Sequence, residues 1–346
     1  MRAVMFAGEG EVRVGEVEEP RIQQPDDALV RVIRAGICGS DLHFIQGKAP
    51  VEPGSVMGHE AVGVVEAAGD AVTRHQPGDR VVASFVIACG ACWFCSRGQT
   101  SLCDDVRHLG AGPFGGDLAG AQAELLRVPA ADVNLLSVPP EVDDERALFV
   151  ADALTTAVYA AAIAGVRSDD VVVIVGAGPV GLLCARSVSA AGAASVLVVD
   201  RVADRLAAAE RMGASAIDAG ARHPVTAVAE ATEGRGADIV LDAVGSAAAF
   251  ELSLDAVRRG GSVLVVGMYA GEQVPLQLGA AWARGLTIRF AGSTPVHDWW
   301  ESTMSAVASG EIDPSVIVTH RLSLEDAEEG YRRFAAKEAI KVVLAP

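Results

Sequence analysis

The sequence predicts a two-domain α/β protein in which a β-rich first domain is joined to a doubly wound parallel sheet. Its 346 residues suit about two domains, and 51 % of them are apolar, which is enough for two sizeable cores. The pattern of predicted secondary structure changes near residue 150, from short β segments broken by Gly and Pro to strands that alternate with helices. Such alternation is typical of βαβ units.

Three segments, 28–35, 61–67 and 80–85, have the β-rich composition of short strands in the first part of the chain. Turn sequences such as Gly69-Asp70 and Pro77-Gly78-Asp79 separate them. This part is predicted to form a mostly antiparallel, barrel-like domain.

The second part opens with the β-branched run 171–175, as expected for a strand buried on both faces of a parallel sheet. Alternation then predicts a helix to about residue 191, strands at 195–200, 239–243, 262–266 and 286–291, and helices over 203–212 and up to 257. The tail, residues 293–346, has helices and a terminal strand at 339–344, and we expect it to rejoin the first domain.

The formal charge of −17 and the pI near 4.8 argue against binding to nucleic acids or anionic membranes, which select basic patches. The long apolar stretch 147–166 is interrupted by Asp152, which favours a buried helix over a membrane span. The N-terminus carries several Glu and no sustained apolar core, unlike a secretory signal. A soluble, cytoplasmic protein is the expectation.

Four of the six cysteines, Cys89, Cys92, Cys95 and Cys103, are clustered in the pattern C-x2-C-x2-C-x7-C. This spacing suits four thiolate ligands around a structural zinc ion. Two disulfides or an iron–sulfur cluster are alternatives by spacing. The absence of a secretory signal argues against disulfides, and the neighbouring motifs favour zinc.

A glycine-rich turn, Gly176-Ala177-Gly178-Pro179-Val180-Gly181, follows the strand at 171–175 and opens a helix. This G-x-G-x-x-G pattern in this setting predicts that the helix N-terminus binds the pyrophosphate of a dinucleotide. Asp200 ends the next strand, nineteen residues past Gly181, and its carboxylate suits the adenosine ribose hydroxyls. The carboxylate would repel a 2′-phosphate, which favours NAD over NADP, whereas a guanidinium such as that of Arg201 can bind a phosphate.

Cys38 and His59 lie outside the four-cysteine cluster and are free to serve a second metal site. A lone buried Cys or His is usually structural, but an Asp in an apolar run needs a partner because a buried charge is costly. A metal ion bound by Asp152 would be such a partner.

Gly58-His59-Glu60 begins the pattern G-H-E-x2-G-x5-G-x2-V, which continues without a mismatch to Val72. With the segment 36–43, the four-cysteine lobe and the G-x-G-x-x-G turn, the chain resembles the zinc-dependent medium-chain alcohol dehydrogenases over essentially its whole length. The resemblance implies a GroES-like catalytic domain (1–153 and 293–346) with a zinc lobe near 89–103. It also implies a Rossmann NAD-binding domain (154–292).

The resemblance implies two zinc ions per chain and hydride transfer from an alcohol to NAD, giving an aldehyde or ketone. Cys38, His59 and Asp152 correspond to catalytic zinc ligands, Glu60 to a fourth or transient ligand, and Asp41 to the acceptor of a hydrogen bond from His59. Ser40 and His43 correspond to a route by which the alcohol proton leaves. Phe85 is expected to wall the substrate pocket. The residues expected at the cofactor by position are Thr156, Val180, Arg205, Val266, Gly267, Met268 and Ala291.

The substrate stays open among primary and secondary alcohols and diols, with threonine, polyol or formaldehyde dehydrogenases as alternatives in the same family. A non-catalytic NAD-binding protein is the alternative of another class. The family resemblance implies a homo-oligomer, with a tetramer favoured over a dimer. The remaining histidines lack motif context and are expected at the surface: His75, His108, His223, His297 and His320.

Overall fold

The computed structural model describes residues 1–116, 118–271 and 273–346. The chain divides into two compact units, one of Met1–Thr155 with Ser293–Pro346 and one of Thr156–Gly292. The break at the start of the second unit lies two residues beyond the predicted position of 153/154, and the tail belongs to the first unit.

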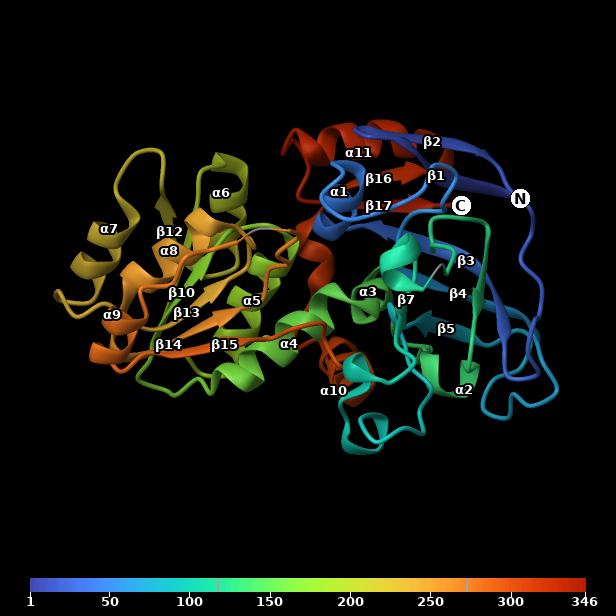
Figure 1. Cartoon of the computed structure of the whole chain (residues 1–346), viewed down its shortest axis with the longest axis horizontal. Helices are drawn as coiled ribbons and strands as arrows, with labels where there is room; N and C mark the ends of the chain where they lie inside the picture. Colours follow the sequence, from blue (N-terminus) through green and yellow to red (C-terminus); the bar gives the residue numbers. More distant parts are fainter. Residues whose placement is uncertain (117, 272) are drawn as a thin grey trace. The chain divides into compact units, whose positions relative to one another are not determined.

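The first unit is built on a seven-stranded sheet with the order β16-β17-β3-β4-β5-β9, in which β8 also pairs with β3 (Figure 1). All its pairings are antiparallel except β16–β17. The strands are β3 (Ala28–Ile37), β4 (Ala61–Ala68), β5 (Arg80–Ala83), β8 (Leu125–Val128), β9 (Leu135–Ser137), β16 (Val318–Ser323) and β17 (Lys341–Ala345).

Strand β17 brings the C-terminal segment beside strand β3 of the N-terminal part of the chain. It pairs antiparallel with β3, where Val342 lies opposite Ile37. The pairing places the last residues of the chain beside the segment that begins at Cys38. Alternate residues of β3, such as Val30 and Val32, are buried, as a strand with one face on a core requires.

Short elements complete the first unit. Strands β1 (Arg2–Gly8) and β2 (Glu11–Glu16) form an antiparallel pair, as do β6 (Val86–Ile87) and β7 (Arg107–His108). The helices are α1 (Gly39–Ile45), α2 (Ala131–Asn134), α3 (Asp144–Leu148), α10 (Val296–Ala308) and α11 (Ala327–Ala335). Tyr331 and Phe334 of α11 pack into the core of this unit with Ile37 of β3.

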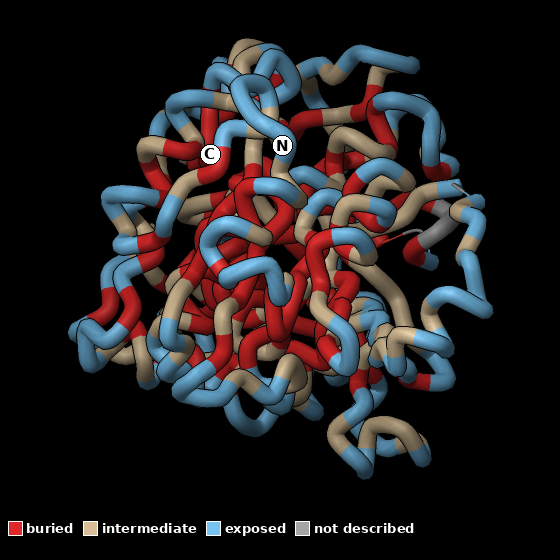
Figure 2. The backbone as a smooth tube through the Cα atoms, turned by 90° about the vertical axis from the view of Figure 1, so that its left-hand side faces the viewer, coloured by how far each residue is buried: buried red, intermediate tan, exposed pale blue. Residues whose placement is uncertain are grey.

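The second unit is a six-stranded parallel sheet of the order β12-β11-β10-β13-β14-β15. Its strands are β10 (Val171–Val175), β11 (Ser195–Asp200), β12 (Ser215–Asp218), β13 (Ala237–Asp242), β14 (Val257–Val265) and β15 (Thr287–Phe290). Its helices are α5 (Pro179–Ala190), α6 (Ala203–Arg211), α7 (Pro224–Ala231), α8 (Ala247–Ala256) and α9 (Leu278–Ala283). Parallel strands connected through helices in this way give the doubly wound fold that the sequence predicts. Figure 2 shows that buried stretches of the backbone lie in the interior and exposed stretches on the outer loops.

Helix α4 (Ala153–Ala164) spans the boundary between the units and contains most of the apolar stretch noted in the sequence. Within the described ranges, no single helix is long and apolar enough to cross a membrane. Two consecutive helical segments, Asp144–Ala151 and Ala153–Ala164, are together long and apolar enough for a span by length and composition alone. They are bent by 53° at the break between them. The bend falls at Asp152, which has φ −152° and ψ −77°.

Candidate metal centres and dinucleotide turn

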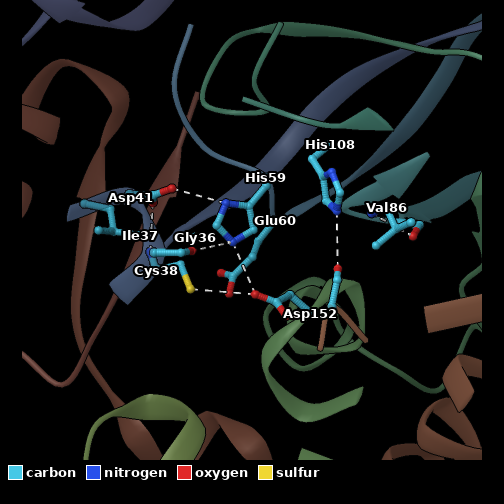
Figure 3. Close-up of polar contacts among 12 residues, drawn as sticks. Gly36, Ile37, Cys38, Asp41, His59, Glu60, Val86, His108 and Asp152 are labelled. Atoms are coloured by element: carbon cyan, nitrogen blue, oxygen red, sulfur yellow. Dashed lines mark hydrogen bonds and ion pairs between the residues drawn. The ribbon is translucent and has the colours of Figure 1, made fainter. Parts of the chain in front are cut away.

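The first candidate centre collects four donor residues from three places in the first unit. Cys38 precedes α1, His59 and Glu60 precede β4, and Asp152 lies between α3 and α4. One ligand atom from each lies within 4.8 Å of all the others, and all four residues are buried. Figure 3 shows their side chains converging on one point. Thiolate, imidazole and carboxylate are ligands that zinc prefers, so this donor set fits the ion.

Asp152 lies at the centre of this cluster. Its Oδ2 is 3.6 Å from Cys38 Sγ and 3.2 Å from His59 Nε2. Ser40 Oγ lies 3.5 Å from the same His59 nitrogen. A hydroxyl therefore lies beside the donor atoms, where a bound substrate would need a proton acceptor.

His59 is oriented from its other side by Asp41 of α1. The Nδ1 atom lies 3.2 Å from Asp41 Oδ1, and Asp41 Oδ2 accepts a hydrogen bond of 2.9 Å from the Cys38 backbone N–H. This arrangement leaves Nε2 for the metal, as is usual for ligand histidines. Burial lowers the pKa of His59, but Asp41 and Cys38 outweigh it and raise that pKa well above its usual value. Metal binding must therefore displace a proton.

Two buried residues that belong to no sequence motif, Tyr331 and Gln122, lie behind Asp41. Tyr331 of α11 donates a 2.8 Å hydrogen bond to Gln122 Oε1 and lies 3.3 Å from Asp41 Oδ2. Gln122 in turn donates to the carbonyl of Gly36 at 2.9 Å. Nothing in the sequence marks these contacts, because Tyr331 lies 290 residues from Asp41.

Lys341 is a third residue that belongs to no sequence motif, and it is fully buried. Its ammonium contacts Glu60 Oε2 and donates to the Ile37 carbonyl at 3.1 Å. A sequence signal existed, since Lys341 interrupts the apolar run 339–344 as Asp152 interrupts its own apolar run. The rule that a buried charge needs a partner applies equally to both residues.

Phe85 and two histidines lie around the centre. The Phe85 ring packs edge-on against His59, with centroids 5.9 Å apart, and His108 lies 6.1 Å from Phe85. His108 Nε2 lies 3.3 Å from Ser293 Oγ. His43 lies three residues after Ser40 on α1, and residues at this spacing share a helix face.

The expectation that the five remaining histidines lie at the surface is wrong for His75, which is buried with Nε2 3.2 Å from the Leu135 carbonyl. His108, His297 and His320 are only partly exposed, and His223 is exposed. A side chain's lack of a motif says nothing about its burial.

The second candidate centre is the four-cysteine lobe. The sulfurs of Cys89, Cys92, Cys95 and Cys103 all lie within 4.8 Å of one another, and none forms a disulfide. Cys92 and Cys95 sulfurs are 3.4 Å apart, and those of Cys89 and Cys95 are 4.0 Å apart. Sulfurs around a tetrahedral zinc are about 3.8 Å apart, given Zn–S bonds of about 2.3 Å. The lobe therefore fits a structural zinc.

Backbone N–H groups of the lobe point at its sulfurs. Cys103 Sγ accepts from Cys89 and Asp105, and Cys92 Sγ accepts from Cys95. The Cys95 N–H is the main cause that lowers the pKa of Cys92 to about 6, while burial raises that of Cys95 to about 12. Such N–H···S hydrogen bonds stabilise thiolates, the form that binds metal.

The dinucleotide turn lies in the second unit between β10 and α5. Gly176 has φ +97°, a conformation that favours glycine. A Cβ on Gly181 would lie 1.9 Å from the Gly176 carbonyl, so this glycine allows the helix to pack on the turn. A Cβ on Gly178 would meet nothing within 4 Å, so space beside its backbone is open. Pro179 is the first residue of α5, whose N-terminus carries the partial positive charge that attracts phosphate.

Asp200 closes β11 and is held by three backbone donors. Its Oδ2 accepts from Ala177 at 2.7 Å, and its Oδ1 accepts from Arg201 at 2.7 Å and Val202 at 2.9 Å. The carboxylate is thereby fixed to the glycine-rich turn. Burial lowers the pKa of Arg205, although Asp200 acts to raise it.

The other residues predicted at the cofactor come from three places in the second unit. Thr156 lies in α4, Val266, Gly267 and Met268 follow β14, and Ala291 follows β15. The carboxyl ends of parallel strands are where open α/β sheets bind ligands. These assignments fit that rule for the residues after β14 and β15.

Two family models match this chain. Residues 24–140 match the alcohol dehydrogenase GroES-like domain, and residues 179–309 match the zinc-binding dehydrogenase domain. The chain belongs to the zinc-dependent medium-chain alcohol dehydrogenase family. Membership confirms the predicted combination of a GroES-like domain with a Rossmann domain.

Relatives within the family match the whole chain. A probable zinc-binding alcohol dehydrogenase of Mycobacterium tuberculosis is 40 % identical, covering 100 % of this chain and 89 % of its own. The alcohol dehydrogenase TADH from Thermus sp. ATN1 is 46 % identical with a TM-score of 0.97, and all of both chains is covered. A putative zinc-binding dehydrogenase of Sinorhizobium meliloti, solved with NADP, is 30 % identical with a TM-score of 0.88, covering 100 % of this chain and 99 % of its own.

Proposed function

We propose that this dehydrogenase transfers a hydride from an alcohol, either a primary or secondary alcohol or a diol, to NAD and releases an aldehyde or ketone. The observation that carries the proposal is the convergence of Cys38, His59 and Asp152 with the Ser40 hydroxyl beside them. Three such donors leave one coordination position for substrate.

When bound, zinc would lower the pKa of an alcohol hydroxyl and NAD would accept its hydride. The residues of the chain supply position and proton transfer. Asp41 fixes the ring of His59 so that Nε2 faces the other donors. Ser40 accepts the hydroxyl proton, and His43, one turn along α1, passes it to water. The carbinol C–H bond breaks as its electron pair goes to NAD, so the products are the carbonyl compound, NADH and one proton.

NAD is proposed over NADP because Asp200 is held at the strand end, where a 2′-phosphate would meet its negative charge. The affinities for NAD and NADP should be compared directly, because Arg201 and Arg205 lie nearby and one relative was solved with NADP. Tighter binding of NADP than of NAD would contradict this part of the proposal.

The decisive experiment combines metal analysis with an absorbance assay of NAD reduction over a panel of alcohols, diols, polyols and amino-acid alcohols. We expect two zinc ions per chain. We expect Cys38→Ser to lose one zinc and to lower activity by about 100-fold or more, since even outer contacts of a metal site change activity by 10–100-fold. Cys184→Ala is the matched control, because Cys184 is a buried thiol of α5 that belongs to neither cluster.

Two outcomes would redirect the proposal. A panel on which only threonine, polyols or formaldehyde react would name an alternative substrate within the family. One zinc per chain with no turnover on any substrate would favour a non-catalytic NAD-binding protein.

A homo-oligomer, with a tetramer favoured over a dimer, is also proposed. The zinc lobe exposes Trp93 and Leu102, whose relative exposures are 58 % and 57 %. Exposed apolar side chains of this size favour a protein contact. Light scattering on the purified protein should give four times the chain mass, 35.6 kDa, and Trp93→Ser should lower that value. A monomer at all concentrations would contradict the proposal.

The proposed location is the cytoplasm. Four closely spaced cysteines remain available as metal ligands where cellular reductants keep thiols from forming disulfides.

A further inference from the structure

Lys341 places a buried positive charge beside the proposed catalytic metal site. Its side chain is fully buried, and its ammonium contacts Glu60 Oε2 and the Ile37 carbonyl. Removing an ammonium from water is costly, and a carboxylate partner offsets that cost. The pair spans 281 residues of sequence, from the start of β4 to the start of β17.

The two oxygens of Glu60 have different surroundings. Lys341 binds Oε2, whereas Oε1 is buried with no hydrogen-bond partner in the part of the chain that the structure describes. Glu60 is also one of the four residues whose ligand atoms lie within 4.8 Å of one another. Its carboxylate is thus held at one oxygen, within reach of the metal donors.

Gly36 provides the space for this ion pair. A Cβ at Gly36 would lie 1.7 Å from Glu60 Oε2 and 2.9 Å from Lys341 Nζ. Gly36 lies within strand β3 and is not among the glycines with positive φ, so its backbone conformation does not demand glycine. The lack of a side chain there leaves room for the Glu60 carboxylate beside Lys341.

The charges divide into two balanced groups. The Cys38 thiolate and the Asp152 carboxylate would neutralise a bound zinc ion, and Lys341 neutralises Glu60. Without Lys341, Glu60 would be a buried carboxylate whose nearest available cation is the metal.

We propose that Lys341 is a positioning residue that holds Glu60 off the metal in the resting protein and so keeps one coordination position open for an exogenous ligand. The inference rests on the zinc site of the proposed function. It makes Lys341, rather than Glu60 alone, the residue that controls whether the glutamate ligates.

The test uses the full-length protein with cobalt(II) in place of zinc and imidazole as the exogenous ligand. Imidazole binding at the open position is followed by the visible spectrum of the cobalt, without any alcohol or NAD. In Lys341→Met, the freed Glu60 carboxylate competes for that position, and we expect the apparent Kd for imidazole to rise about tenfold or more. The cobalt spectrum before imidazole is added should also change.

Two further variants separate positioning from general damage. Lys341→Met combined with Glu60→Gln should return the Kd for imidazole toward the wild-type value, because an amide is a poor competitor for the metal. Gly36→Ala, which keeps Lys341 but displaces Glu60 from it, should weaken imidazole binding as Lys341→Met does. Lys337→Met, four residues from Lys341 and exposed, is the matched control and should change nothing.

Unchanged imidazole affinity and spectrum in both Lys341→Met and Gly36→Ala would overturn the inference. So would weakened binding that the added Glu60→Gln change does not relieve, because that pattern indicates a structural role. If the wild type takes up only one cobalt per chain, the metal site itself fails and the proposed function falls with the inference. Normal imidazole behaviour without turnover of any alcohol would count against the function alone.

Discussion

Individual buried side chains of this dehydrogenase show which kinds of residue can be read from sequence. Asp152 was identified because it interrupts an apolar run and because the family motif gives it a place. Lys341 interrupts an apolar run in the same way, but no motif indicated a role for it. Its partner Glu60 lies 281 residues away, and only the pairing of β17 with β3 brings them together.

His297 of α10 provides a pH prediction at this scale. Its Nε2 lies 2.8 Å from Asn134 Oδ1, while its Nδ1 is buried without a partner among the described residues. Burial lowers its pKa to about 4. An unfolded histidine has a pKa of about 6.5, so the unfolded state binds more protons below that pH. The contribution of His297 to stability is therefore fully present above about pH 6.5 and declines as the pH falls toward 4.

The measurement is urea unfolding at about pH 7 and about pH 5. Protonation of His297 should lower the unfolding free energy of the wild type by up to about 2 kcal/mol at about pH 5 relative to about pH 7. A smaller value is expected because the ring is partly exposed. His297→Gln should lose less stability over this range, whereas His223→Gln, at an exposed position, should behave like the wild type. Equal losses in the wild type and His297→Gln would show that His297 does not titrate as predicted.

At the scale of elements, hydrophobic patterning predicted the apolar strands well, and the polar or very short ones poorly. The β-branched run 171–175 coincides with β10, and 195–200 coincides with β11. Strand β14 begins at Val257, five residues before the predicted start, because its first half contains Arg and Gly and lacks apolar alternation. Strands such as β6 and β7 have two residues each and carry no periodic signal.

The turn between β10 and α5 provides a matched pair of glycine variants. Gly181→Ala should destabilise the protein by about 1–3 kcal/mol, because its Cβ would overlap the Gly176 carbonyl. Gly178→Ala should leave stability nearly unchanged, since that Cβ meets nothing within 4 Å. It should still weaken NAD binding, because its methyl group would occupy space that the pyrophosphate needs. Thermal unfolding and NAD titration distinguish the two effects, and a Gly178→Ala protein with normal NAD affinity would contradict the assigned turn.

At the scale of the whole molecule, the sequence predicted the division into two units and the return of the tail to the first. The prediction was possible because the change from short β segments to alternating strands and helices extends over many residues. The network of Tyr331, Gln122 and Lys341 could not be predicted, since it depends on how separate segments meet in three dimensions. Family motifs identify residues that contact the metal or the cofactor, but they do not identify the residues that support those contacts.

Hydrogen exchange should report the two units separately. Removing metal with a chelator is expected to raise exchange around residues 89–103 and at the backbone near Cys38 and His59, since bound metal stabilises the folded site. NAD is expected to slow exchange in the turn after β10 and at the start of α5. Cys38→Ser is the control, because the chelator should then affect the lobe alone. Chelation that loosened the second unit as much as the first would contradict this separation.

The pairing of β17 with β3 also has a consequence for how the protein is made. A ribosome releases residues 1–155 first, then the whole of the second unit, and only afterwards the segment that contains β17. Domains usually fold in the order in which they are synthesised, but here the first unit lacks β16 and β17 of its sheet until the whole second unit has been synthesised. Until then Glu60 has no ammonium beside it. The second unit can therefore fold on the nascent chain first, and the candidate metal centre acquires its final form only after β17 has been synthesised.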